Sequence, residues 1–157
     1  MRYLLIDRIE RLEINRTLTA IKSVALSEDI YADHFVGSPV TPGAMLIESL
    51  AQAGTALLEV SNNFEKKALL VIVEQAKFRN LVRPGDQLLV AVTITALSED
   101  SAQMDGTIHV KDRLVTDARL TFALKPSKDF YPPRTRHLVD AIYETWLRET
   151  EIIGREK

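Results

Sequence analysis

The chain has 157 residues, of which 46% are hydrophobic and 27% charged, and its formal net charge is −2 at pH 7. This length and composition indicate one globular domain with a buried core, and they exclude a disordered or fibrous protein. The near-neutral charge gives no basic field for nucleic acid, and the lack of cysteine excludes disulfides, thiolate metal sites and a cysteine nucleophile.

The N-terminal segment carries charges at Asp7, Arg8, Glu10 and Arg11, so it lacks the apolar core of a signal peptide. No uninterrupted apolar stretch approaches the ~20 residues that a membrane span needs. We therefore expect a soluble, cytoplasmic protein without a membrane span.

The first third of the chain predicts two strands, a loop and a long helix. Residues 12–26 are strand-like, with Asn15-Arg16 as the turn between two arms, and residues 27–40 form an ordered loop. Thr41-Pro42 predicts the helix start, because threonine can cap free N–H groups and proline suits the first helical position. The helix should run to about Val60.

The next part of the chain predicts antiparallel strands over residues 68–80, 88–97, 102–110 and 114–124, with turns at 83–86, 98–101 and 111–113. Asp105-Gly106 favours a tight turn. Because a turn there would leave only short strand fragments, we expect a bulge instead. One long apolar helix followed by such strands predicts an α+β domain, with the helix buried against a curved sheet.

The composition changes after Pro126, and Tyr131-Pro132-Pro133 interrupts regular structure. Residues 135–150 predict an amphipathic helix with two adjacent apolar rows. These rows are Leu138, Ile142, Trp146 and Val139, Tyr143, Leu147. The sequence therefore predicts a main domain over residues 1–126 and a helical extension over residues 127–157.

Two titratable side chains near the predicted helix start could carry chemistry. His34 lies in the loop before the helix, where N–H groups are free and the helix dipole favours negative charge. Glu48 interrupts the apolar run of the helix, and such a pair is the minimum equipment for removing one proton and donating another. Taken singly, each has a structural alternative: a loop histidine, and an exposed polar stripe formed with Gln52, Thr55 and Glu59.

The segment from Asp33 to Ala53, DHFVGSPVTPGAMLIESLAQA, resembles the signature of hot-dog-fold (3R)-hydroxyacyl-acyl-carrier-protein dehydratases. In that family the His and the Glu stand fourteen positions apart, as His34 and Glu48 do. Residues 5–9, 20–24, 77–79, 82–88 and 122–123 are similar to further blocks of the family, in the same order. Two features depart from it: Val36 replaces the usual proline after His-Phe, and the part after Pro126 has no counterpart in a minimal member.

The resemblance implies the hot-dog fold, a long central helix wrapped by a curved antiparallel sheet, here with an extra C-terminal helix. It implies dehydration of a (3R)-3-hydroxyacyl thioester to the trans-2-enoyl thioester, with His34 taking the α-proton and Glu48 protonating the departing hydroxyl. Gly43 would offer a backbone N–H to the enolate oxygen, and Gln52 would orient Glu48. Candidates for contact with the acyl chain, which could equally be plain core, are Phe35, Met45, Leu46 and Phe78.

The resemblance also implies partners. The substrate would arrive on the phosphopantetheine arm of an acyl carrier protein, which could dock on Lys77, Arg79 and Arg83, although these residues could also be a solvated strand edge. A homodimer is implied, or a larger assembly of such dimers, with the His from one subunit and the Glu from the other; no metal and no diffusible cofactor is needed.

Alternatives to this reaction stay open. They are a hot-dog acyl thioesterase, a dehydratase that also isomerises the double bond (where the helix acid is typically Asp), and a non-catalytic carrier-binding subunit of a heterodimer. Fatty acid synthesis and other acyl-chain pathways, the acyl chain length, and the role of the extension also stay open.

Overall fold

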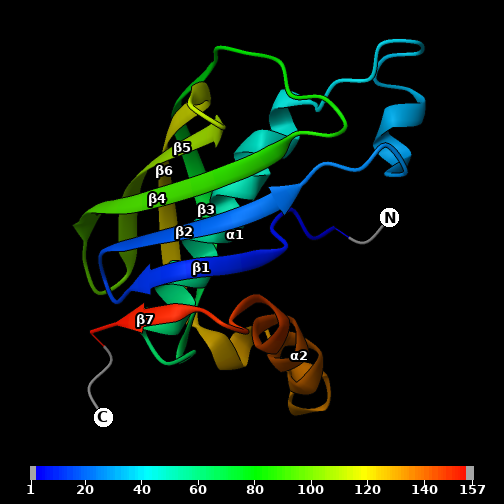
Figure 1. The fold of residues 1–157 in the computed structure, drawn as a ribbon. Coiled ribbons are helices and arrows are strands. Elements are labelled where there is room, and N and C mark those ends of the chain that lie inside the picture. The colour runs from blue at the N-terminus through cyan, green and yellow to red at the C-terminus, as the bar shows by residue number, and fades with distance from the viewer. Residues whose placement is uncertain (1–2, 155–157) are drawn as a thin grey trace.

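The computed structural model describes residues 3–154, which form one seven-stranded sheet and a long helix packed against it. The strand order is β3-β6-β5-β4-β2-β1-β7, and every neighbouring pair is antiparallel except β1 and β7. The strands are β1 (Arg8–Glu13), β2 (Thr17–Ser23), β3 (Lys66–Phe78), β4 (Gln87–Leu97), β5 (Ser101–Val110), β6 (Arg113–Pro126) and β7 (Glu151–Ile153). Figure 1 shows the sheet curving around the helix, as predicted.

Helix α1 (Gly43–Ser61) supplies the centre of the core. Its sequence is apolar on nearly all sides, which is typical of a helix enclosed by other elements. Leu50, Ala53, Ala56 and Leu57 are fully buried, and they face the inward side chains of the sheet. The predicted helix and the four predicted strands after it are confirmed within two or three residues at each end.

The structure corrects three details of the N-terminal prediction. β1 begins at Arg8, four residues before the predicted strand, although the turn at Asn15 is present. The loop contains a short 3₁₀ helix, η1 (Asp29–Ala32). Thr41 does not cap α1, because its hydroxyl lies 2.7 Å from the Tyr31 hydroxyl and Pro42 takes the cap position without a side-chain bond.

The predicted bulge at Asp105-Gly106 is wrong. Gly106 pairs in regular register with Val92 on one side and Ala118 on the other. A Cβ on Gly106 would lie 2.8 Å from the Leu50 side chain, so the glycine allows the helix to approach β5 closely. The DG pair is therefore explained by packing and not by local chain reversal.

The extension, which we call the tail (residues 127–153), leads from the end of β6 to the β1 edge of the sheet. After the 3₁₀ turns η2 (Ser127–Asp129) and η3 (Pro133–Thr135), it forms α2 (Arg136–Trp146), which ends four residues before the predicted end at Thr150. Strand β7 was not predicted; it pairs in parallel with β1 and covers that edge of the sheet. Tyr143 and Trp146 of α2 belong to the main core cluster, so the tail shares the core of the domain.

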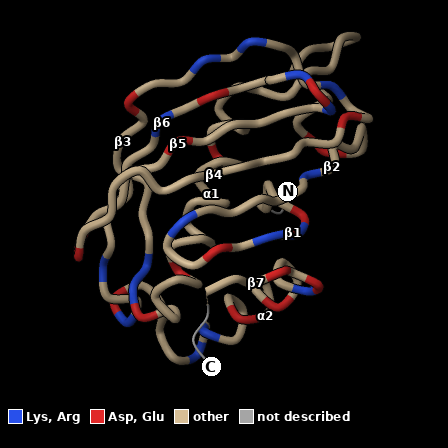
Figure 2. Tube along the Cα trace, turned by 60° about the vertical axis from the view of Figure 1, so that its left-hand side comes forward, with Lys and Arg blue, Asp and Glu red and all other residues tan. Residues whose placement is uncertain are grey.

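Lys and Arg are interspersed with Asp and Glu along the trace, and α1 is largely free of both (Figure 2). No helix within residues 3–154 is long and apolar enough to cross a membrane.

Candidate active site

His34 lies in the loop between η1 and α1, and its ring is fixed by the backbone. Nδ1 lies 2.9 Å from the Val40 carbonyl oxygen, and the Val40 N–H in turn donates to the His34 carbonyl at 2.9 Å. A carbonyl oxygen only accepts hydrogen bonds, so Nδ1 carries the hydrogen of the neutral ring. This tautomer leaves the lone pair on Nε2, which makes Nε2 the atom able to accept a proton.

The loop that carries His34 is tied to the turn between β3 and β4. The Arg83 guanidinium donates to Ser38 Oγ at 3.2 Å and to the Pro39 carbonyl at 3.3 Å. The Thr41 N–H donates to the Val82 carbonyl at 2.9 Å. These bonds hold both sides of the loop in place and so define the position of the imidazole.

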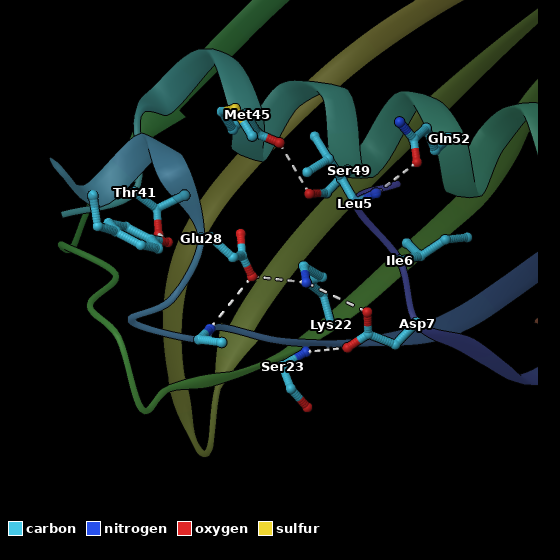
Figure 3. A network of polar contacts seen from close by, with 12 residues as sticks. Leu5, Ile6, Asp7, Lys22, Ser23, Glu28, Thr41, Met45, Ser49 and Gln52 are labelled. Atoms are coloured by element: carbon cyan, nitrogen blue, oxygen red, sulfur yellow. Dashed lines mark hydrogen bonds and ion pairs between the residues drawn. The ribbon is translucent and has the colours of Figure 1, made fainter. Parts of the chain in front are cut away.

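Glu48 lies on α1, half-buried, and is oriented by Gln52 one turn later. Gln52 Nε2 donates to Glu48 Oε1 at 3.0 Å, while Gln52 Oε1 accepts the Leu5 N–H at 2.8 Å (the latter bond in Figure 3). Because the Leu5 N–H can only donate, it fixes the amide oxygen toward Leu5 and the amide nitrogen toward the carboxylate. Glu48 also lies near Tyr3. The pKa of the Tyr3 phenol is raised above its usual value, first by burial and to a smaller extent by the charge of Glu48.

Glu48 and Gln52 line a cavity of about 320 Å³ between α1, β3 and the tail. Most of its lining is apolar, and a volume of this size falls at the lower end of small-molecule sites. Apart from Leu4, the other lining residues are Ala51 and Thr55 of α1, Lys67, Ala68, Leu69 and Leu70 of β3, and Tyr131, Val139, Ile142, Tyr143 and Trp146 of the tail. The sequence does not predict the tail residues as site residues. The two apolar rows of the predicted C-terminal helix are the sequence pattern that could have pointed to them.

Glu59 is the last member of the polar stripe considered as an exposed face of α1, and it is buried. The residue is 1% exposed, and its carboxylate accepts hydrogen bonds from Lys67 Nζ (2.7 Å), the Ala68 N–H (3.3 Å) and the Tyr143 hydroxyl (2.6 Å). Burial and the Glu59 carboxylate raise the pKa of Tyr143 well above its usual value. The alternative of an exposed stripe is therefore wrong for Glu59, whose charge is paired inside the protein.

The other predicted substrate contacts lie around the start of α1. The Phe78 ring lies 2.9 Å from where a Cβ on Gly43 would stand, so Gly43 and Phe78 are in close contact. Phe35 stacks on His34 with ring centroids 4.2 Å apart, and Met45 is buried. Of the predicted substrate residues, only Gln52 lines the cavity with Glu48.

The Gly43 N–H makes no hydrogen bond among the described residues, because the first helical bonds run from Met45 and Leu46 to the Pro42 carbonyl. The predicted enolate donor therefore has a free N–H at the helix start. Its assignment to the enolate stays a prediction.

The predicted carrier-docking residues have different surroundings. Arg79 is ion-paired with Asp117, Arg83 holds the His34 loop, and Lys77 is exposed on β3. Two of the three are thus bonded within the chain, and docking stays a prediction for all three.

Within residues 3–154, His34 and Glu48 share no hydrogen bond or ion pair, and His34 does not line the cavity. In the same part of the chain no group of three or more His, Asp or Glu side chains is placed to hold a metal ion. A single chain thus presents the imidazole in one place and the carboxyl group in another.

Solved structures of low sequence identity share the architecture. A protein from Streptococcus mutans bound to acetyl CoA matches with a TM-score of 0.61 at 14% identity, over 76% of this chain and 88% of that one. The dehydratase heterocomplex ApeI:P from Xenorhabdus doucetiae matches with a TM-score of 0.54 at 16% identity, over 69% and 88%. The long helix wrapped by the sheet is the hot-dog fold, as predicted, and it defines the structural class of the protein.

Sequence comparison gives the family. The FabA-like domain matches residues 1–120. The 3-hydroxyacyl-[acyl-carrier-protein] dehydratase FabZ of Levilactobacillus brevis is 36% identical over 127 residues, which cover 80% of this chain and 86% of that protein. FabZ of Halalkalibacterium halodurans is 37% identical over 124 residues, or 78% and 89% of the two chains. The chain belongs to the FabA-like domain family.

Proposed function

We propose that this protein is a hydro-lyase that dehydrates (3R)-3-hydroxyacyl-acyl-carrier-protein to the trans-2-enoyl form in fatty acid biosynthesis. The observation that carries the proposal is the pair of oriented groups. His34 has its Nδ1 hydrogen bonded to a carbonyl and its Nε2 available, and Glu48 is held by Gln52 beside an apolar cavity. The FabZ relatives, which match most of the chain, are 3-hydroxyacyl-[acyl-carrier-protein] dehydratases.

In the proposed reaction, His34 Nε2 removes a proton from the α-carbon of the thioester. The electron pair moves first toward the thioester oxygen, where an N–H at the start of α1 stabilises the developing negative charge. The pair then forms the double bond as the 3-hydroxyl leaves. Glu48, in its neutral form, gives the proton that converts this hydroxyl to water, and a proton returned from His34 restores both groups.

The geometry supports a site built from two subunits. Because His34 and Glu48 of one chain share no contact, the base that acts with Glu48 is proposed to be His34 of the partner subunit. β3 lies at an open edge of the sheet and exposes Val71, Ile72 and Val73, which suits pairing with a second copy. We therefore infer a homodimer with two sites.

The acyl carrier protein is the proposed partner that delivers the substrate, and Lys77 is the docking candidate that is most available at the surface. A cytoplasmic location is expected for a protein acting on such a carrier, and cell fractionation tests it.

The test is the absorbance of the conjugated enoyl thioester during incubation with (3R)-3-hydroxyacyl substrates. We expect wild type to equilibrate the two forms and His34→Ala and Glu48→Ala each to lose about 10²–10⁴ in rate, the usual value of a positioned acid or base. His109→Ala on β5 and Glu99→Ala in the β4–β5 turn are matched controls that should keep wild-type rates, because neither lies at the site. Release of free thiol in place of enoyl product would contradict the proposal and identify a thioesterase.

A further inference from the structure

The cavity beside Glu48 has three walls from different parts of the chain. Glu48, Ala51, Gln52 and Thr55 follow the i, i+3, i+4, i+7 spacing of one face of α1. The start of β3 gives the second wall through residues 67–70, and α2 gives the third. A molecule whose reactive end is at Glu48 can therefore extend along this helix face, between the sheet and the tail.

The third wall lies outside the part of the chain that the family domain matches. The family match ends at residue 120, and Val139, Ile142 and Trp146 lie beyond it. A hot-dog domain without the tail would leave this side of the cavity open.

Buried polar contacts hold that wall in place. Trp146 Nε1 donates to the Ile6 carbonyl at 3.1 Å, Tyr143 donates to Glu59, and Thr150 Oγ1 donates to the Ile9 carbonyl at 2.7 Å. Strand β7 then joins the sheet beside β1. The α2 wall is thus anchored within and after the residues that face the cavity, which fixes its position relative to α1.

The chemistry of the walls selects a hydrocarbon. Most of the lining consists of aliphatic and aromatic side chains. The lining has two ionisable groups of opposite sign: Glu48, the proposed acid, and Lys67, which is already paired with Glu59 at 2.7 Å and lies over the Tyr131 ring at 5.2 Å. A negatively charged end of a ligand would find no unpaired positive charge there, so its desolvation would be uncompensated. An alkyl chain meets no such cost.

We propose that this cavity is the acyl-chain site and that α2 of the tail limits the length of chain it accepts. The inference rests on the proposed dehydratase function and adds a limit on the length of the acyl chain. With the thioester at Glu48, the chain runs toward Thr55 and Lys67, and Val139 and Ile142 of α2 bound the space beside it. Longer chains meet this wall, whereas short chains end before it.

Two kinds of variant test the wall. Val139→Ala and Ile142→Ala remove methyl groups from it and enlarge the space, while Val139→Phe fills it. Leu138→Ala is the matched control, because Leu138 is on the same helix but 58% exposed and does not line the cavity. For each protein, the rates on 3-hydroxyacyl thioesters of four to sixteen carbons give a ratio of kcat/KM for long over short chains, and thermal unfolding verifies that the variant folds.

We expect the ratio to rise about tenfold in the enlarged variants and to fall about tenfold in Val139→Phe, the usual effect of a methylene-sized change in an apolar pocket. Leu138→Ala should keep the wild-type ratio. If wild type is active but the ratio of kcat/KM for long over short chains is the same in all folded variants, the inference about α2 is overturned and the proposed function is not. A folded wild type that dehydrates no chain length overturns the proposed function and the inference with it.

Discussion

At the scale of single residues, the positions of both titratable groups depend on contacts with distant parts of the sequence. Gln52 orients Glu48 and is itself held by the backbone of residues 3–5. Arg83, for which the family resemblance implies carrier docking, holds the His34 loop through Ser38 and Pro39. The spacing of His34 and Glu48 is visible in the sequence, but these orienting bonds depend on the tertiary structure.

The two roles of Arg83 predict different kinetics. Arg83→Ala should lower kcat about 10- to 100-fold with little change in KM, because misplacing a reacting group by about 1 Å costs on that order. The loss should be equal for a small acyl thioester and for the carrier-bound substrate, since both use His34.

The matched control is Arg119→Ala, which removes an exposed arginine paired with Asp105 on the sheet and should leave both rates unchanged. A loss seen only with carrier-bound substrate would contradict the positioning role and assign Arg83 to docking instead.

At the scale of elements, hydrophobic periodicity predicts α1 and the strands, because α1 is apolar over five turns and β4 and β5 alternate with period two. It does not predict which glycines mark a turn. Gly85 lies in a turn with φ +97°, whereas Gly54 and Gly106 lie inside α1 and β5 where the two elements approach closely. Only the packing separates these cases.

Gly54→Ala tests this packing. The substitution should have two effects of opposite sign on the free energy of unfolding. Alanine favours the helix by about 1 kcal/mol over glycine. Its Cβ would lie 2.7 Å from Phe122 Cζ, and Phe122 is fully buried, so overpacking should cost about 1–3 kcal/mol. We expect a net destabilisation, measured as a lower free energy of unfolding in urea.

A double-mutant cycle with Phe122→Leu identifies the cause. The smaller side chain should make Gly54→Ala less costly than in wild type, a favourable coupling between two residues in contact. Equal effects of Gly54→Ala in both backgrounds would show that Phe122 is not the obstacle.

At the scale of the whole molecule, the two edges of the sheet differ. The tail covers one edge by placing β7 beside β1, while β3 leaves the other edge open with exposed apolar side chains. The sequence could not predict β7, since three residues carry no periodicity and their pairing with β1 spans most of the chain. The tail therefore leaves β3 as the only open edge within the described sheet.

Charges on β3 should separate the proposed dimer. A two-fold interface brings each residue near its own copy or a close neighbour, so Val71→Lys with Val73→Lys would place like charges together on an edge where lysines disfavour strand pairing. We expect the variant to sediment as a monomer and to lose activity, since His34 of one subunit would no longer meet Glu48 of the other. Glu151→Lys, a lysine on the β7 edge, should remain an active dimer. A double variant that stays dimeric would place the interface elsewhere, and an active monomer would mean that one chain completes the site.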